Sequence, residues 1–126
     1  MKRVTGLGGI FFKANNPEKI REWYKIHLGI ESESWGAQLN WGDETNSKQP
    51  GYNVWNPFKA DTTYFEPSDK QFMINFRVEN LKELVSLLKN EGIEIIGEMI
   101  EDDFGTFAWI IDPEGNKLEL WEPPKI

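Results

Sequence analysis

The order of structural signals along this chain occurs twice, and this repeat constrains the fold more than any other feature. At an offset of 64 residues, four positions in the first half match four in the second: Ile10, Phe12, Asn16 and Lys25 with Ile74, Phe76, Asn80 and Lys89. At 63, Gly29–Glu31 matches Gly92–Glu94, and at 66, Val54–Pro57 matches Leu120–Pro123. The same order of strand, helix, helix end and closing strand indicates a duplicated βαβββ unit. An α+β sandwich without duplication is the competing interpretation.

Local signals in the first half predict one helix between strands. Asn16 can cap the helix, Pro17 suits its first turn, and Gly29 ends it after about His27. Extended segments are expected at Thr5–Ala14, Glu33–Trp41 and Tyr52–Asn56, followed by a crossing loop at Pro57–Lys70.

The second half predicts the same order of elements. Asn80 can cap a helix whose apolar positions run from Leu81 to Leu88, and Gly92 ends it. Strands are expected at four segments: Phe72–Val78, Ile93–Ile100, Thr106–Ile111 and Lys117–Trp121. Pro123 and Pro124 stop the last of them.

Two motifs carry a resemblance to a known family. The turn Asp112–Asn116, with sequence Asp-Pro-Glu-Gly-Asn, leads into the apolar-Glu-apolar strand around Glu119, and Trp23-Tyr24 precedes Leu28-Gly29-Ile30. With the repeat, these motifs resemble the vicinal oxygen chelate superfamily, which includes glyoxalases, bleomycin-resistance proteins and dioxygenases. The resemblance implies one α+β domain over residues 1–126, with paired modules at about 1–58 and 70–126 and a linker at about 59–69. Their curled mixed sheets would surround a cleft.

The resemblance also implies four inward positions that hold a divalent metal in metal-dependent members. These positions fall on Gly9 and Met73 in the first strands and on Asn53 and Glu119 in the last strands. Glycine has no side-chain donor, and a thioether is a poor ligand for hard or borderline cations. No metal cofactor is therefore expected, although an oxygen-only Mg²⁺ or Mn²⁺ site on Glu119 stays open. The single histidine, His27, lies at a helix end and is interpreted as surface structure.

Strand alternation then predicts which side chains line the cleft. If Gly9 and Met73 point inward, the inward set also contains the ligand-binding candidates Phe11, Lys13, Asn53, Trp55, Asn75, Arg77 and Trp121, together with Lys117. Trp41 is a further candidate, and Trp41 and Trp109 could line the cleft or pack in the core. Arg77 and Glu119 could pair across the cavity. The opposite faces, with Ile10, Phe12 and Phe72, are apolar and suit packing under the two helices.

Composition narrows the function classes. The net charge of −7 disfavours binding to nucleic acid, and no apolar run is long enough to cross a membrane. There is no cysteine, so disulfides and thiolate chemistry are excluded, and a cytoplasmic location is expected. Six Trp residues exceed what a core of this size requires, which favours a site for a flat ligand.

The leading hypothesis is a metal-free protein that binds a small aromatic or cationic molecule in a Trp-rich cleft. It resembles the bleomycin-resistance branch, which implies antibiotic sequestration and a homodimer. The alternative is a glyoxalase-type lyase or isomerase with Glu119 as general base, because an apolar cleft can raise a carboxyl pKa toward neutrality. A third possibility is an interaction or regulatory module without ligand turnover.

Overall fold

The computed structural model describes residues 3–41 and 51–125. The first half contains β1 (Val4–Ala14), α1 (Pro17–Leu28), β2 (Ala37–Trp41) and β3 (Gly51–Lys59). The second half contains β4 (Phe72–Val78), α2 (Leu81–Asn90), β5 (Ile100–Asp102), β6 (Gly105–Ile111) and β7 (Lys117–Glu122). Among the described residues, the second half has the predicted order βαβββ, whereas the first half has βαββ and only an isolated bridge between Glu33 and Gly36 before β2.

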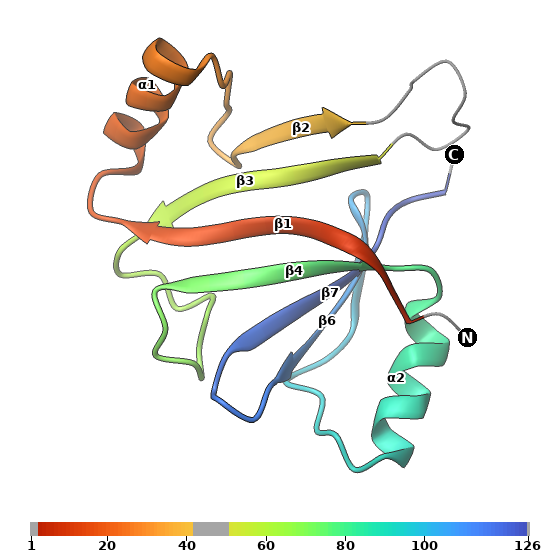
Figure 1. The fold of residues 1–126 in the computed structure, drawn as a ribbon. Helices are drawn as coiled ribbons and strands as arrows, with labels where there is room; N and C mark the ends of the chain where they lie inside the picture. Colours follow the sequence, from red (N-terminus) through yellow and green to blue (C-terminus); the bar gives the residue numbers. More distant parts are fainter. Residues whose placement is uncertain (1–2, 42–50, 126) are drawn as a thin grey trace.

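Seven strands of the described residues form one mixed sheet in the order β2-β3-β1-β4-β7-β6-β5. β1 is parallel to β3 and β4 is parallel to β7, while β1 and β4 run antiparallel where the two halves meet. Figure 1 shows the sheet with α1 and α2 at opposite ends. The closing strand of each half thus lies beside its opening strand, so side chains from both strands share one face of the sheet.

The register reveals an internal two-fold relation. Ile10 pairs with Ile74, its partner at an offset of 64. On either side of this pair, Phe11 meets Met73 and Gly9 meets Asn75, as a local two-fold axis requires. The axis makes Phe11 equivalent to Asn75.

The same relation corrects the alignment of the closing strands. Phe11 pairs with Asn56 in β3, and Asn75 pairs with Glu119 in β7. The counterpart of Glu119 is therefore Asn56, at an offset of 63. The offset of 66 assigned Asn53 to this position and is wrong, because it followed the Trp-x-Pro similarity of the strand ends instead of the pairing.

The two helices begin as predicted. The Asn16 side chain accepts a hydrogen bond from the Lys19 amide, and the Asn80 side chain accepts one from the Glu83 amide. Gly29 caps α1 with a φ of 70°, which is unfavourable for other residues. α2 ends at Asn90, just before the predicted stop at Gly92.

The helices differ in how they pack. α2 buries Leu81, Leu84 and Val85 in a core that includes Val78 of β4 and Leu120 of β7. α1 has no buried residue, and its main aromatic contact is Tyr24 on Trp55, with ring centroids 4.6 Å apart. The apolar face of β1 and β4 is consequently only partly covered.

The expectation that this face packs under the helices is thus wrong in part. Ile10 is 46% exposed and Phe72 39% exposed, although Phe12 contacts Trp55. The two helices stand at opposite ends of the sheet and leave the middle of the face open (Figure 1).

Three predicted strand boundaries need correction. The expected strand at Ile93–Ile100 begins only at Ile100, and the segment before it touches the sheet through one backbone bond, from the Ile96 amide to the Trp109 carbonyl. The strand expected from Glu33 starts at Ala37, after an isolated bridge between Glu33 and Gly36. β3 continues through Lys59, so the crossing loop begins later than predicted. Neither described helix could cross a membrane.

Candidate functional site

An aromatic cleft of about 340 Å³ lies on one face of the sheet. Most of its lining side chains are aromatic, and they come from both halves of the chain and from three loops. The lining consists of Gly8, Phe11, Trp35, Gln38, Tyr52, Val54, Asn56, Phe58, Tyr64, Asn75, Phe104, Phe107, Glu119 and Trp121. Glu119 is the one formally charged residue of this set.

Glu119 is held in the cleft wall by three hydrogen bonds. Its side chain is only 2% exposed, because β7 lies inside the sheet between β4 and β6. Asn75 Nδ2 donates to Oε1 at 2.6 Å and Trp109 Nε1 donates to Oε2 at 2.8 Å. The Tyr64 hydroxyl makes a third hydrogen bond, with Oε2. The carboxyl group therefore ties both neighbouring strands and the crossing loop together.

Burial dominates the electrostatics of this cluster. It raises the pKa of Glu119, while the hydrogen bonds from Tyr64, Asn75 and Trp109 and the charge of Lys117 oppose the rise. Burial and the neighbouring Glu119 also raise the pKa of Tyr64. Lys117 has its pKa lowered by burial, against the opposing pull of Glu119. The cleft thus combines an apolar lining with a carboxyl group whose proton affinity is increased.

The loop between β3 and β4 forms a wall of the cleft. Lys117 Nζ donates to the Tyr64 carbonyl at 2.6 Å, and the Tyr64 ring stacks on Phe58 with centroids 5.5 Å apart. The neighbouring Phe65 is fully buried against Phe11, Met73 and Trp109. The hydrogen bond from Lys117 and the burial of Phe65 therefore hold this loop in place, with Tyr64 directly against Glu119.

Of the residues considered from the sequence, three line the cleft, and two, including Trp109, which had no assigned face, are buried next to it. Phe11, Asn75 and Trp121 line the cleft. Met73 is fully buried beneath it, and Trp109 is buried beside Glu119.

Lys13 and Arg77 lie near the cleft without lining it. Lys13 Nζ is 5.9 Å from the centroid of Phe65, and the Arg77 guanidinium carbon is 6.0 Å from the centroid of Trp121. The pairing of Arg77 with Glu119 is not formed. Trp41 ends β2, and its side chain lies outside the described residues.

The assignment of Asn53 and Trp55 to the cleft is wrong. Trp55 packs on Tyr24 of α1, and Asn53 donates to the Leu7 carbonyl. Their neighbours Tyr52, Val54, Asn56 and Phe58 line the cleft instead. A strand alternates its faces, so the shift between offsets 66 and 63 exchanged the two sides of β3.

Several cleft residues escaped sequence reasoning for related reasons. An offset of 63 for the closing strands, close to the 64 of the opening strands, would have predicted four of them: Tyr52, Val54, Asn56 and Phe58. Gly8 lines the cleft because the pairing of β1 and β4 shifts between Leu7 and Gly9. The remaining cleft residues lie in segments that strand alternation alone does not place. They are Trp35, Gln38, Tyr64, Phe104 and Phe107.

The cleft does not fit the metal site that the family resemblance implies. Gly9 brings no ligand, Met73 is buried under the cleft, and Asn56, the counterpart of Glu119, offers only an amide oxygen. Three N–H and O–H donors contact Glu119 and occupy most of the lone-pair sites of its carboxylate. Within residues 3–41 and 51–125, no three His, Cys, Asp or Glu side chains form a group that could hold a metal ion.

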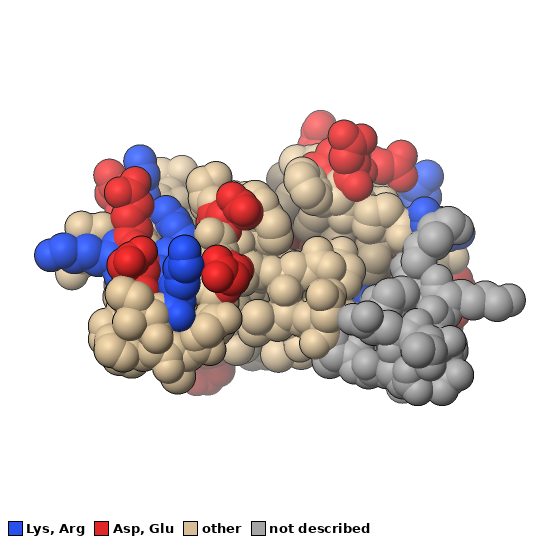
Figure 2. Space-filling model, turned by 90° about the horizontal axis from the view of Figure 1, so that it is seen from above, with Lys and Arg blue, Asp and Glu red and all other residues tan. Residues whose placement is uncertain are grey.

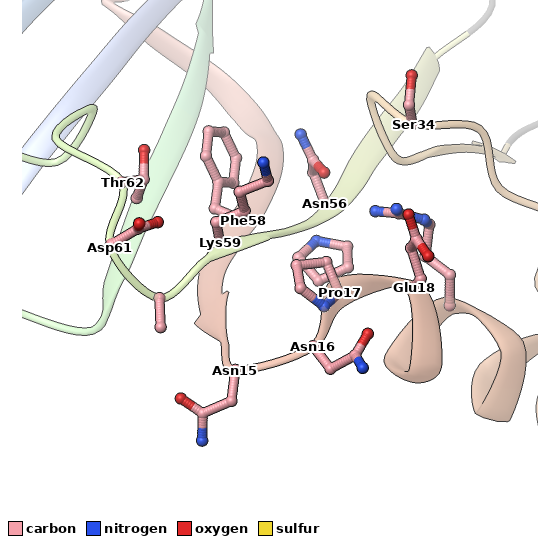
Figure 3. Close-up of a pocket in the computed structure, with 13 residues that line it drawn as sticks. Asn15, Asn16, Pro17, Glu18, Ser34, Asn56, Phe58, Lys59, Asp61 and Thr62 are labelled. Carbon is pink, nitrogen blue, oxygen red and sulfur yellow. The ribbon is translucent and has the colours of Figure 1, made fainter.

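A second, more polar hollow of about 820 Å³ lies where β1 and β3 end. Figure 3 shows side chains from the start of α1, from β3 and from the loop that carries Asp61 and Thr62. Asn56 and Phe58 belong to both hollows, so the polar one adjoins the aromatic cleft. On the face in Figure 2, charged side chains of both signs gather near two ends, with uncharged residues between them.

Comparison with known proteins identifies the fold and no closer relationship. No protein-family model and no curated sequence matches the chain. A variant of methylmalonyl-CoA epimerase from Streptomyces coelicolor, in complex with 2-nitronate-propionyl-CoA, has a TM-score of 0.67 at 16% identity, covering 97% of this chain and 99% of that one. Methylmalonyl-CoA epimerase from Mycobacterium tuberculosis has a TM-score of 0.62 at 17% identity, covering 99% and 92%.

A catechol 2,3-dioxygenase also matches, with a TM-score of 0.58 at 24% identity over 99% of this chain and 43% of the longer dioxygenase. These likenesses define the class of fold. It is the curled mixed sheet with two helices found in the glyoxalase-like structures of the vicinal oxygen chelate superfamily. The predicted α+β fold class is thus confirmed.

Proposed function

We propose that the protein binds a small, flat organic molecule in the aromatic cleft without a metal ion. The observation that carries this proposal is the lining of the cleft, where aromatic rings surround a small number of polar groups. Such a composition is typical of sites for small molecules, in which apolar contacts supply affinity and polar groups set orientation.

The geometry supports capture of a ring between two walls. Tyr52 and Phe58 of β3 stand on one side, and Trp121 of β7 and Phe107 of β6 on the other. The Tyr52 and Trp121 rings lie 5.3 Å apart at 63°, an edge-to-face contact at one end of the cleft. Among the two ligand classes expected from the sequence, aromatic and cationic, these walls favour the aromatic one, since donors surround the single carboxyl group.

Binding can be tested by calorimetric titration of a panel of flat aromatic compounds in the presence of a chelator. Val54→Phe would add a ring inside the cleft and should weaken binding by about tenfold or more, since an overfilled site excludes its ligand. The matched control is Val4→Phe, the same change at a valine that is 41% exposed outside the cleft. Binding that requires added metal, or that Val54→Phe leaves unchanged, would contradict the proposal.

A second candidate function is proton transfer at a carbon acid, as in a glyoxalase-type lyase or isomerase. The raised pKa of Glu119 and its position in the cleft wall favour it, because a general base works best near the ambient pH. Its test is hydrogen–deuterium exchange of a bound ligand followed by NMR. Exchange that persists in Glu119→Gln would rule out this role.

We also propose that the chain forms a homodimer, as the family resemblance implies. The partly covered face of β1 and β4 supports an association of this kind, because Val4, Leu7, Ile10 and Phe72 are all exposed there. Sedimentation analysis at micromolar concentration tests it, and a monomer at all concentrations would contradict it.

A further inference from the structure

The polar hollow at the ends of β1 and β3 is larger than the aromatic cleft that it adjoins. Its volume is about 820 Å³, against about 340 Å³ for the cleft, and both volumes lie within the range of about 300–1,000 Å³ that is usual for small-molecule sites. Asn56 and Phe58 line both hollows, so a molecule in the cleft reaches the polar hollow at these two residues. A ligand that extends beyond its flat ring can therefore place a second part there.

The hollow lies where β3 continues past the end of its pairing with β2. That pairing reaches only Trp55, so among the described residues the edge of β3 over 56–59 has no strand on this side. Pro57 has no N–H group to leave unpaired, and proline suits such an edge. Figure 3 shows Ser34 and Asn56 extending to the same side, with the start of α1 nearby. The unpaired edge of β3 and the start of α1 thus form two walls of the hollow.

The charged side chains of the hollow balance in sign. Glu18 and Asp61 are acidic, and Arg21 and Lys59 are basic. In the described part of the chain, none of these four belongs to an ion pair. An anionic group in the hollow would lie near two carboxylates, and a cationic group would lie near two basic side chains, so a like charge opposes either one. The lining therefore favours an uncharged polar group.

The hydrogen-bonding capacity of the lining narrows the kind of uncharged group. Carboxylates only accept hydrogen bonds, guanidinium and ammonium groups only donate them, and the amide of Asn56 and the hydroxyl of Ser34 do both. A hydroxyl group on a ligand can pair with every one of these, because it donates one hydrogen bond and accepts two. Phe58 adds an apolar surface for the C–H groups of a ring. Several hydroxyl groups on one saturated ring, as in a sugar, match this combination.

We propose that the ligand of the cleft is a flat aromatic molecule with an uncharged, hydroxyl-rich arm, of which an aryl glycoside is the simplest example. The aromatic ring lies in the cleft, and the linkage passes Asn56 and Phe58. The hydroxyl groups of the arm bond to side chains of the polar hollow, including Arg21 and Asp61. This inference rests on the proposed function and names the class of molecule that the cleft and the hollow select together.

Calorimetry with a series of phenols tests the arm, because the ring and its ether oxygen stay the same throughout. The parent compound is 4-methoxyphenol, and its methyl group is replaced by a glucosyl, a galactosyl, a carboxymethyl or an aminoethyl group. The better of the two glycosides should bind about tenfold or more tightly than 4-methoxyphenol, since its hydroxyl groups find partners in the hollow. Both charged arms should bind more weakly than this glycoside. A charged arm that binds most tightly, or no gain from either sugar, would overturn the inference.

A pair of variants in α1 locates the arm. Arg21→Met removes the guanidinium donors from the hollow and should reduce the advantage of the glycoside several-fold. It should retain the affinity for 4-methoxyphenol, which also shows that the protein is folded and the cleft intact. The matched control Lys19→Met removes a positive charge from the same helix outside the hollow and should keep the advantage. An unchanged advantage in Arg21→Met would overturn the placement of the arm.

The same titrations separate this inference from the proposed function. If 4-methoxyphenol binds and neither sugar adds affinity, this inference fails alone. If the methyl glycoside, which lacks the aromatic ring, binds as tightly as the aryl glycoside, the aromatic cleft is not the binding site and the proposed function fails. If none of these compounds and no other flat aromatic compound binds, both fail.

Discussion

The part of the sheet that holds β2, β3 and β1 and the part that holds β4, β7 and β6 have equivalent strand pairings, with β5 added at the edge of the second, yet they bury different side chains. The second half contains the core beneath α2 and the hydrogen-bonded Glu119. The first half leaves α1 without a buried residue and contributes a wall of half-buried rings. The two parts therefore differ in burial: the second holds the core beneath α2, and the first contributes half-buried rings to the cleft wall.

The largest expected effect separates the two helices. Leu84→Ala in α2 should lower the free energy of unfolding by about 2–5 kcal/mol, because it leaves a cavity around a side chain that is 2% exposed. Ile26→Ala in α1 changes a side chain that is 64% exposed and should cost less than about 1 kcal/mol. Denaturant unfolding measures both. Similar losses of unfolding free energy for the two variants would show that the two helices contribute equally and would contradict this account.

The closing strands offer the next contrast. Glu119→Ala leaves the buried Asn75 and Trp109 donors without their acceptor and should cost about 2 kcal/mol of unfolding free energy. Asn56→Ala, at the equivalent position of the first half, should stay within about 0.5 kcal/mol of the wild-type protein, because Asn56 is only half-buried. Thermal and denaturant unfolding test the pair. A larger loss of unfolding free energy for Asn56→Ala than for Glu119→Ala would contradict the conclusion that the stabilising polar contacts lie in the second half.

Two glycines of β1 test how closely the halves pack. A Cβ atom at Gly8 would lie 1.9 Å from Asn75 Oδ1 and 3.1 Å from the Trp121 ring. Gly8→Ala should therefore displace Asn75, cost about 1–2 kcal/mol of unfolding free energy and weaken ligand binding. Gly6→Ala is the matched control, since nothing lies within 4 Å of its Cβ position. Equal stability and affinity in the two variants would contradict the described contact of Gly8 with Asn75.

The smallest effect is a pH dependence from Glu119. Its pKa is raised in the folded state, so the folded protein holds this proton at pH values where the unfolded chain has released it. Stability from this group is complete below the unfolded value of about 4.3 and is lost as the pH rises toward the folded pKa. The unfolding free energy of the wild-type protein, relative to Glu119→Gln, should therefore fall with rising pH above about 4.3. A rising difference would mean that the hydrogen bonds outweigh burial.

Much of the fold could be predicted from the sequence because its signals are local. Asn16 and Asn80 cap the helices as expected, and β4 has the predicted bounds. The sequence predicts a strand from Ile93, but the segment before Ile100 makes one backbone bond to the sheet. Propensity alone does not decide whether a segment finds a partner strand.

The candidate site was predictable in its second half and not in its first. Glu119 followed from the family resemblance, and Asn75 and Trp121 followed from alternation along regular strands. β3 was aligned three residues out of register, and because three is an odd number this moved Asn53 and Trp55 to the cleft and hid Val54 and Asn56. Tyr64 was recognised as part of a loop, but its hydrogen bond with Glu119 depends on tertiary packing that no periodicity encodes.

The central claim, that the aromatic cleft binds a flat molecule without metal, is most directly tested by indole NMR. The six Trp side chains each give one N–H signal, and a titration with 4-methoxyphenol or another flat aromatic compound in a chelator would follow them together. The signals of Trp35 and Trp121, which line the cleft, should shift, while that of Trp55 beneath α1 should remain in place. A shift of Trp55 with Trp121 unchanged, or shifts that appear only after metal is added, would contradict the account.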